Sequence, residues 1–330
     1  MEIRRAQETD GPAIMSFIDR HWKRGHALGT SSSLFNWQHR DPQGGYTYML
    51  AVEDEEILGV LGYIPSRLFE QSASNVVWLA LWKIRDDVKR PALGLQLLRA
   101  LEHTEPHETI AVNGINASLP PMYKALGYQV VRLSQHYVTN PLHVKRILRG
   151  QNEWPVPKFG EASFVTLNES NLAGIELKHK TLPEKGPSYF INRFLRHPIY
   201  RYNVHLLQHN ARQALIATRI ATAGDAKVLR IVDFAGDVGV LAESGSAFAQ
   251  LMKREFIEYA DIFQHGLCVE ALERAGFAPV TAAIVVPNYF EPFLAANGDI
   301  ISAFKSKSEL PFVICRADGD QDRPNQIFPQ

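Results

Sequence analysis

The chain has 330 residues, 45% hydrophobic and 21% charged, and its 35 Lys and Arg residues balance 35 Asp and Glu residues. This length fits two domains of ordinary size, and the neutral balance argues against a general nucleic-acid binder, which would show a basic excess. No apolar stretch approaches the roughly 20 residues that cross a bilayer, and the first residues lack the apolar core of a signal peptide. We therefore expect a cytoplasmic protein with neither a nucleic-acid nor a membrane partner.

The two cysteines, Cys268 and Cys315, have no metal-ligand spacing. We expect two buried, reduced thiols and no bound metal, and we leave a disulfide between them open. The composition does not indicate an oligomeric state.

The first 112 residues alternate between apolar strands and amphipathic helices. In chain order the patterns predict a strand over 2–6, a helix capped by Thr9 or Asp10, a hairpin of strands over 48–53 and 57–69, a strand over 76–84, a helix over 95–102 and a strand over 109–112. This order indicates an α/β fold.

One stretch, residues 78–98, organises this part of the chain. A buried strand is followed by a short loop and then by a helical pattern. The loop contains the basic and small residues Lys89, Arg90, Ala92 and Gly94. The first N–H groups of a helix have no partner inside it and the helix dipole is positive there, so this junction favours an anion such as a phosphate.

A second informative stretch covers residues 113–128. A strand ends in asparagines, a short helix follows, and Gly127 caps that helix before the chain enters a strand. The helix ends in the spacing Tyr123-x-x-x-Gly127-Tyr128. Residues 129–139 then indicate a final hairpin strand that closes the unit.

These two stretches and the order of elements resemble the GNAT superfamily of N-acyltransferases over about residues 1–140. Lys89-x-x-Ala92-x-Gly94 is similar to the family's pyrophosphate loop, Gln/Arg-x-x-Gly-x-Gly/Ala, with Lys at the first position and Ala at the first glycine. The resemblance implies acyl-CoA binding, with acetyl-CoA as the expected co-substrate. The pantetheine arm would be held by the strand residues Leu81, Trp82, Lys83 and Ile84, and the pyrophosphate by Lys89, Arg90, Ala92, Leu93 and Gly94.

The second half follows a polar, proline-bearing linker, residues 150–157, so we predict an N-terminal domain over 1–150 and a C-terminal domain over 151–330. Its elements repeat the order of the first half, and Leu272-x-x-x-Gly276-Phe277 echoes the helix ending of residues 123–128. At Asp233-Phe234-Ala235-Gly236 the basic loop residues are missing. The second half is therefore similar to a GNAT-like domain that has lost acyl-CoA binding.

The resemblance also suggests catalytic groups. Tyr123 stands where the family often places the acid that protonates the leaving thiolate, and Asn113 or Asn116 would bond to the pantetheine arm or cap a helix. Strand 76–84 lacks the family's frequent carboxylate, so His21 and His26 are the candidate bases, with His136 as a weaker third. If water relays the proton of the amine, no side chain is required as the base.

Aromatic and amide residues mark candidate substrate contacts. A platform for a sugar ring or for a base of the substrate would be formed by Trp22, Phe35, Trp37 and Gln38. The default alternative is that these side chains pack in the core. In the second half the polar residues Tyr189, Arg193, His197 and Tyr200 suit a cleft between the domains.

We thus predict two tandem GNAT-like domains, each with a mixed, mostly antiparallel central sheet flanked by helices. The expected activity is acyl-CoA-dependent N-acylation of a small-molecule amine by direct attack on the thioester. Similar two-domain proteins acylate amino sugars for bacterial surface polysaccharides, which makes an amino sugar the expected acceptor. The alternatives are a FemABX-like aminoacyl transferase that uses aminoacyl-tRNA, and a non-catalytic binding or scaffold protein with a decayed site.

Overall fold

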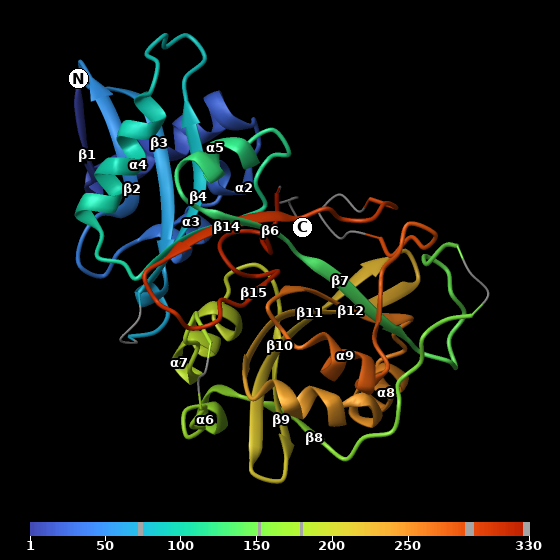
Figure 1. Cartoon of the computed structure of the whole chain (residues 1–330). Coiled ribbons are helices and arrows are strands. Elements are labelled where there is room, and N and C mark those ends of the chain that lie inside the picture. Colours follow the sequence, from blue (N-terminus) through green and yellow to red (C-terminus); the bar gives the residue numbers. More distant parts are fainter. Residues whose placement is uncertain (72–74, 151–152, 179–180, 288–293, 326–330) are drawn as a thin grey trace.

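A computed structural model describes residues 1–71, 75–150, 153–178, 181–287 and 294–325. Two lobes lie side by side, each built on one sheet (Figure 1). The elements up to residue 150 are β1 (Glu2–Ala6), α1 (Gly11–Phe17), the π-helix η2 (Ile18–Trp22), α2 (Ala27–Thr30), α3 (Ser32–His39), β2 (Tyr46–Glu53), β3 (Glu56–Pro65), β4 (Val76–Ile84), α4 (Leu93–Thr104), β5 (Thr109–Asn113), α5 (Pro120–Ala125), β6 (Gln129–Arg132) and β7 (Ser134–Thr139), with short 3-10 turns η1 (Glu8–Asp10) and η3 (Ser66–Leu68).

The second half repeats this order. Its elements are β8 (Ser163–Leu167), α6 (Glu169–Leu172), α7 (Pro187–Phe190), the π-helix η4 (Ile191–Leu195), β9 (Asn203–His209), β10 (Arg212–Ala223), β11 (Ala226–Gly236), the 3-10 helix η5 (Val238–Glu243), α8 (Gly245–Arg254), β12 (Tyr259–His265), α9 (Val269–Ala275), β13 (Ala278–Pro279), β14 (Ile301–Ser306) and β15 (Ile314–Cys315). The predicted α/β class and the two mixed, mostly antiparallel sheets flanked by helices are confirmed.

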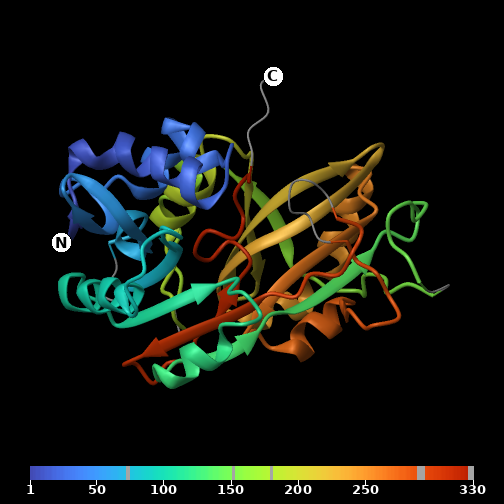
Figure 2. The same cartoon turned by 90° about the horizontal axis from the view of Figure 1, so that it is seen from above.

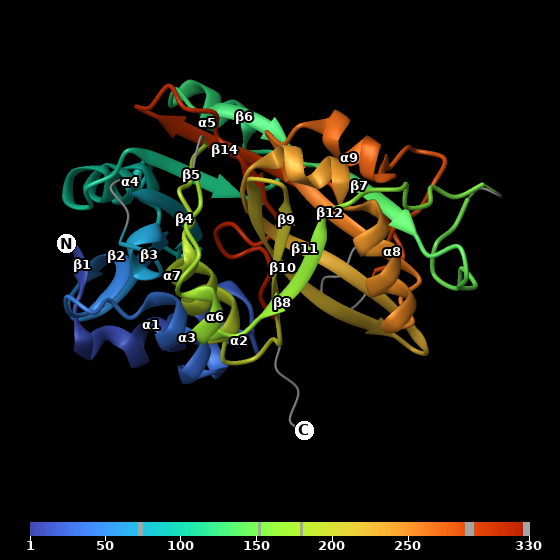
Figure 3. The same ribbon diagram turned by 90° about the horizontal axis from the view of Figure 1, so that it is seen from below.

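The two halves exchange one strand each. The first sheet has the order β1-β2-β3-β4-β5-β14-β6, and the second has β13-β7-β12-β11-β10-β9-β8. In Figures 1 and 3 the red strand β14 accordingly lies in the lobe of β1–β6, and the green strand β7 lies beside β12. The prediction that residues 129–139 close the first unit as one hairpin strand is therefore wrong, because β6 and β7 belong to different sheets. The predicted boundary at residue 150 stays a prediction about the folding units.

Helices cover both faces of the first sheet. The apolar side chains of α4 and α5 pack on one face with Leu79, Val112 and Ala303, the last of these from β14. Helices α1 to α3 cover part of the other face, where they pack with Leu81. The remainder of that face meets the second half through a shared core that includes Trp78 and Phe194.

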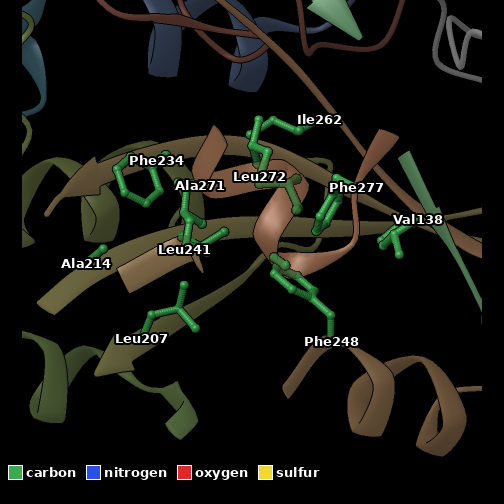
Figure 4. Packing of buried hydrophobic residues seen from close by; sticks show 14 of the residues in the cluster. Val138, Leu207, Ala214, Phe234, Leu241, Phe248, Ile262, Ala271, Leu272 and Phe277 are labelled. Carbon is green, nitrogen blue, oxygen red and sulfur yellow. The ribbon is translucent and has the colours of Figure 1, made fainter. Parts of the chain in front are cut away.

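The core of the second half also depends on the exchange. Figure 4 shows Val138 of β7 among Phe248 of α8, Ile262 of β12 and Phe277, which follows α9. These side chains are nearly or fully buried. A first-half residue thus completes the second core.

Two smaller predictions are corrected. The helix predicted over 95–102 is longer, at Leu93–Thr104, because Ala92 ends the preceding loop in a left-handed conformation. Cys268 is exposed, whereas Cys315 is buried, and both thiols are free. No helix within the described ranges is long and apolar enough to cross a membrane.

Candidate functional site

The first candidate feature is a divergence between two parallel strands. β4 and β5 pair only from Val76 with Thr109 to Leu79 with Val112. Directly after this last pair, Ala80 and Leu81 of β4 face the single residue Gly62 of β3, a β-bulge that bends β4 away. None of the backbone hydrogen bonds recorded among the described residues joins 80–84 to the β5 side. Among the described residues, the end of β4 over 80–84, which includes the predicted pantetheine contacts, therefore has no backbone partner on the β5 side.

The loop after β4 ends at the N-terminus of α4. Ala92 adopts φ +67°, the left-handed region that favours glycine, at the position of the first glycine in the loop pattern. A Cβ on Gly94 would lie 3.2 Å from Nε1 of Trp82, so this turn of the helix has little room for a side chain. Ala92 is exposed. The first N–H groups of a helix have no partner inside it, and here the N–H of Leu93 donates to the carbonyl of Arg90 at 3.3 Å, so the next N–H groups of α4 are the candidates for an anion.

Charge at this loop is less positive than its sequence suggests. Lys83 contacts Asp86 at 2.5 Å, Arg85 contacts Asp87 and Glu56 at 2.6 and 2.8 Å, and Arg90 contacts Glu53 at 2.8 Å. Lys89 is exposed and has no acidic partner within the described chain. Lys89 is thus the loop cation that is left for an anionic ligand.

The second half has the same divergence, and its own chain enters it. β11 and β12 pair in parallel up to Ile231 with Ile262, and β11 then carries one extra residue, Val232. Here Cys315 pairs with Gln264 of β12, and the N–H of Ala317 donates to the carbonyl of Val232 at 2.9 Å. The segment 314–317 therefore bridges the two strands where they begin to diverge, and a cavity lined by residues 234–238, Gly266 and Val313 remains beyond it.

The N-terminus of α8, the counterpart of α4, is covered as well. Residues 158–162, which follow the predicted linker, lie across it: the N–H of Gly160 donates to Oγ of Ser246 at 3.0 Å, and the N–H of Ala162 donates to the carbonyl of Glu243 at 2.9 Å. A Cβ on Gly245 would lie 2.0 Å from the carbonyl oxygen of Lys158. The two halves are therefore alike in fold and unlike in access.

Tyr123 is buried in the core under α4, and its ring meets that of Tyr128 at 5.3 Å. Burial raises the pKa of Tyr123, so the phenol keeps its proton at neutral pH. Asn113 donates from Nδ2 to the carbonyls of Cys315 and Asp318 at 3.1 and 3.0 Å and accepts from Ser302 at 2.7 Å. Its amide is therefore committed to the chain itself.

Asn116 is exposed and caps the next turn, because its Oδ1 accepts from the N–H and the hydroxyl of Ser118. Of the two asparagines considered for the pantetheine arm, Asn116 is the one whose side chain faces solvent.

The three histidines lie in different places. Nδ1 of His26 accepts from the N–H of Leu28, so the proton of the neutral ring is on Nε2, which is buried without a partner in the described structure. Burial lowers the pKa of His26 to about 3. His21 is half-buried against Phe17, beside the β2–β3 turn. His136 is on β7 and therefore belongs to the second sheet.

The four proposed substrate contacts do not form one platform. Phe35 is fully buried in the core between Tyr46 and Tyr48, and Trp22 is 47% exposed. Gln38 is buried, and its Nε2 bonds to Nε2 of His39. Trp37 alone reaches the seam between the halves, where its Nε1 donates to the carbonyl of Asn192 at 3.1 Å.

The seam contains the polar residues that the sequence places between the domains. Arg193 lies beside the rings of Trp37 and Phe69, and the ring of His197 meets that of Trp37 at 4.3 Å. Tyr189 is buried against Phe69. Figure 2 shows the red C-terminal segment running through this seam between the lobes.

The C-terminal segment brings a carboxylate that the sequence reasoning missed. Gly319 packs on the first sheet, where a Cβ would lie 3.6 Å from Cβ of Trp78 and 3.7 Å from Cβ of Asn113. The next residue, Asp320, is 8% exposed and contacts Arg323 at 3.0 Å through Oδ2. Burial, with the Asp320 carboxylate, raises the pKa of Tyr48. Asp320 therefore lies near the start of the β4–β5 divergence, and no local sequence pattern marks it.

Comparison with known proteins gives the fold. No family model matches the chain, and no curated protein matches it in sequence. Among solved structures, the GCN5-related N-acetyltransferase from Anabaena variabilis superposes with a TM-score of 0.58 at 11% identity, covering 92% of this chain and 72% of that one. The GCN5-related N-acetyltransferase from Kribbella flavida gives 0.57 at 10% identity, with 92% and 70% covered. The chain therefore has the fold of tandem GNAT-like domains.

Proposed function

We propose that this chain is an acyl-CoA-dependent N-acyltransferase, with acetyl-CoA as donor, and that its active site lies in the first half. The observation that carries the proposal is the contrast between the halves. In the first, no backbone hydrogen bond recorded among the described residues joins β4 beyond Leu79 to β5, and Ala92 before α4 is exposed. In the second, the segment 314–317 bonds to both diverging strands, and residues 158–162 cover the start of α8.

The residues present suit an acyl-CoA. An extended arm with amide groups would bond to the free backbone of Leu81, Trp82, Lys83 and Ile84. The pyrophosphate would meet the N–H of Gly94 and the ammonium of Lys89, as helix N-termini and basic side chains bind phosphates. The N–H of Leu93 would have to leave the carbonyl of Arg90, to which it donates at 3.3 Å. Arg90 would join only by leaving Glu53, an exposed contact that contributes little. The left-handed Ala92 gives the loop the shape that the family obtains with glycine.

The chemistry needs a neutral amine, a fixed thioester and a proton donor for the leaving thiolate. The amine nitrogen would bond to the thioester carbonyl carbon, the C–S bond would break, and Tyr123 would protonate the sulfur. Asp320 would accept the proton that the amine loses. The contacts of Asp320 with Arg323 involve Oδ2, so Oδ1 is the oxygen that would accept this proton. His26, with a pKa of about 3, is a weaker proton acceptor than its sequence position suggests.

The acceptor would be a small-molecule amine that enters from the seam between the lobes. An amino sugar used in surface polysaccharide synthesis is the class that the resemblance suggests, and a cytoplasmic location follows from acyl-CoA use. The second half would serve as a structural partner that delivers the C-terminal segment to the first.

The test is release of CoA thiol from acetyl-CoA in the presence of a panel of primary amines. Lys89→Glu should raise the KM for acetyl-CoA by about 10-fold or more, because it reverses the charge at the pyrophosphate position. Arg99→Glu is the matched control, an exposed basic residue on the same helix. Equal KM values for Lys89→Glu and the wild type would contradict the proposed site.

A further inference from the structure

Arg193 is a buried cation with an incomplete set of partners. Its side chain is 5% exposed, and its Nη2 donates to the carbonyls of Ala317, at 3.0 Å, and of Gly319. Its Nη1 is buried and has no hydrogen-bond partner among the residues that the structure describes. Its Cζ lies 5.0 Å from the Trp37 ring and 4.9 Å from the Phe69 ring. The guanidinium is thus held by neutral groups alone within the described chain.

Other buried arginines of the same interior each contact a carboxylate. Arg230 contacts Asp261 at 3.2 Å, and Arg219 and Arg316 share Asp322, at 3.0 and 3.2 Å. A buried charge is costly unless it is paired. Carbonyl contacts and aromatic faces compensate only part of that cost. Arg193 therefore lacks the anion that its neighbours have.

A second donor borders the same tryptophan. Nδ1 of His197 accepts from the N–H groups of Ile199 and Tyr200 at 3.1 and 2.9 Å. The proton of the neutral ring is therefore on Nε2, which is buried without a partner among the described residues. Buried donors without partners are rare in native proteins and commonly mark a missing water or ligand.

These donors lie next to the proposed acceptor position. Gly319, whose carbonyl accepts from Arg193, directly precedes Asp320 and packs on Trp78 and Asn113 where β4 and β5 begin to diverge. Asp320 is paired with Arg323, so this pair is close to neutral and supplies no anion to Arg193. The carbonyl that accepts from Arg193 and the carboxylate of Asp320 therefore belong to adjacent residues, 319 and 320.

We propose that Arg193, assisted by His197, binds an anionic group of the acceptor, so that the substrate class is an amine bearing a carboxylate or a phosphate close to its amino group. This rests on the proposed acyltransferase function. The anion would take the position beside Nη1 and the amine the position beside Oδ1 of Asp320. Neutral amines would lack the first contact.

The test uses two matched pairs of acceptors: phenethylamine with L-phenylalanine, and glucosamine with glucosamine 6-phosphate. Thiol release from acetyl-CoA should give the anionic member of one pair a kcat/KM higher by about 10- to 100-fold, the range expected for a charged hydrogen bond. The pair that shows the preference identifies carboxylate or phosphate. Equal values within both pairs would overturn the proposal.

Arg193→Gln keeps a donor for the tail carbonyls and removes the charge, so it should abolish the preference. Arg196→Gln is the control, because Arg196 is exposed and paired with Glu169. A preference that survives Arg193→Gln would overturn the assignment. If that variant loses cooperative unfolding, Arg193→Lys replaces it, and it should retain only part of the preference because it lacks the planar fork.

A binding measurement separates this proposal from the proposed function. Inorganic phosphate and acetate are titrated calorimetrically into the full chain at constant ionic strength. Binding of either anion by the wild type and not by Arg193→Gln supports the anion site even if no acetyl transfer occurs, an outcome that would count against the acyltransferase function alone. Absence of binding of both anions by the wild type would overturn the anion site.

Discussion

At the scale of single residues, the sequence predicts the backbone on either side of the loop 85–92 well, because a strand, a turn and a helix start are local features. The binding roles of Lys89, Ala92 and Gly94 stay predictions. Side chains whose roles depend on distant contacts are predicted poorly. Phe35 is core and Asn113 is bonded to the C-terminal segment. Asp320 comes from more than 200 residues beyond β5, and no spacing rule connects them.

Ala92 gives the first prediction. A non-glycine residue in the left-handed region costs about 1 kcal/mol or more relative to glycine. Ala92→Gly should therefore raise the free energy of unfolding by about 1 kcal/mol in urea titrations, without weakening acetyl-CoA binding. Asn210, also at positive φ but in the β9–β10 turn, provides a control through Asn210→Gly, which should leave acetyl-CoA binding unchanged. A decrease in stability for Ala92→Gly would contradict the conformation of this loop.

Asp320 gives the second prediction. Asp320→Asn should lower kcat by about 100-fold or more, the usual contribution of a general base, while the affinity for acetyl-CoA stays the same. Asp320→Glu should restore part of the rate. Glu309→Gln, at an exposed acidic residue earlier in the C-terminal region, is the control. A kcat of Asp320→Asn equal to that of the wild type would contradict this role and would mean that water accepts the proton of the amine.

At the scale of elements, the exchange of β14 and β7 distinguishes this chain from two independent domains. The alternating pattern of residues 129–139 predicts strand correctly, but it cannot say which sheet the strand joins. That choice depends on pairing with residues more than 100 positions away: Tyr137 opposite Asp261 in the second sheet, and Ala303 opposite Val112 in the first.

The exchange predicts that the halves depend on each other. A fragment of residues 1–150 lacks β14, which lies between β5 and β6 and supplies Ile301 and Ala303 to the core under α4. This fragment should show no cooperative unfolding transition, whereas the full chain should unfold in one transition. Co-expression with residues 151–330 should restore folding. A cooperative transition in the isolated fragment would support an autonomous domain boundary at residue 150.

At the scale of the whole molecule, buried neutral histidines make stability depend on pH. Burial lowers the pKa of His26, His39 and His205 to about 3. Below the unfolded value, near 6.5, the unfolded chain therefore binds more protons than the folded one. Stability is fully present above pH 6.5 and is lost as pH falls toward 3.

The free energy of unfolding should accordingly decrease between pH 7 and pH 5, by up to about 2 kcal/mol for each histidine. Burial raises the pKa of Asp318 to about 6, which works in the opposite direction. This is one group against four histidines, because burial also lowers the pKa of His197 to about 3. Urea titrations at both pH values measure the change, and His205→Gln should reduce it. Stability that is equal or higher at pH 5 would contradict neutral burial of these rings.

We also propose that one half of the molecule binds acyl-CoA and that the other half does not. The halves share a fold, a divergence of parallel strands and a helix that follows it, and they differ in what covers these features. The shared fold alone would therefore predict two acyl-CoA sites in each chain. Because the equivalent features of the second half are covered by its own chain, we predict one.

Calorimetric titration of acetyl-CoA into the full chain tests this claim most directly. The account predicts one site per chain with micromolar affinity, lost in Gly94→Glu, where a negative side chain would face the pyrophosphate, and retained in Gly94→Ala. Both variants are checked for an unchanged melting temperature, because a Cβ at Gly94 lies close to Trp82. Absence of binding by the wild type would contradict the acyltransferase account, and two sites per chain would contradict the closed second half.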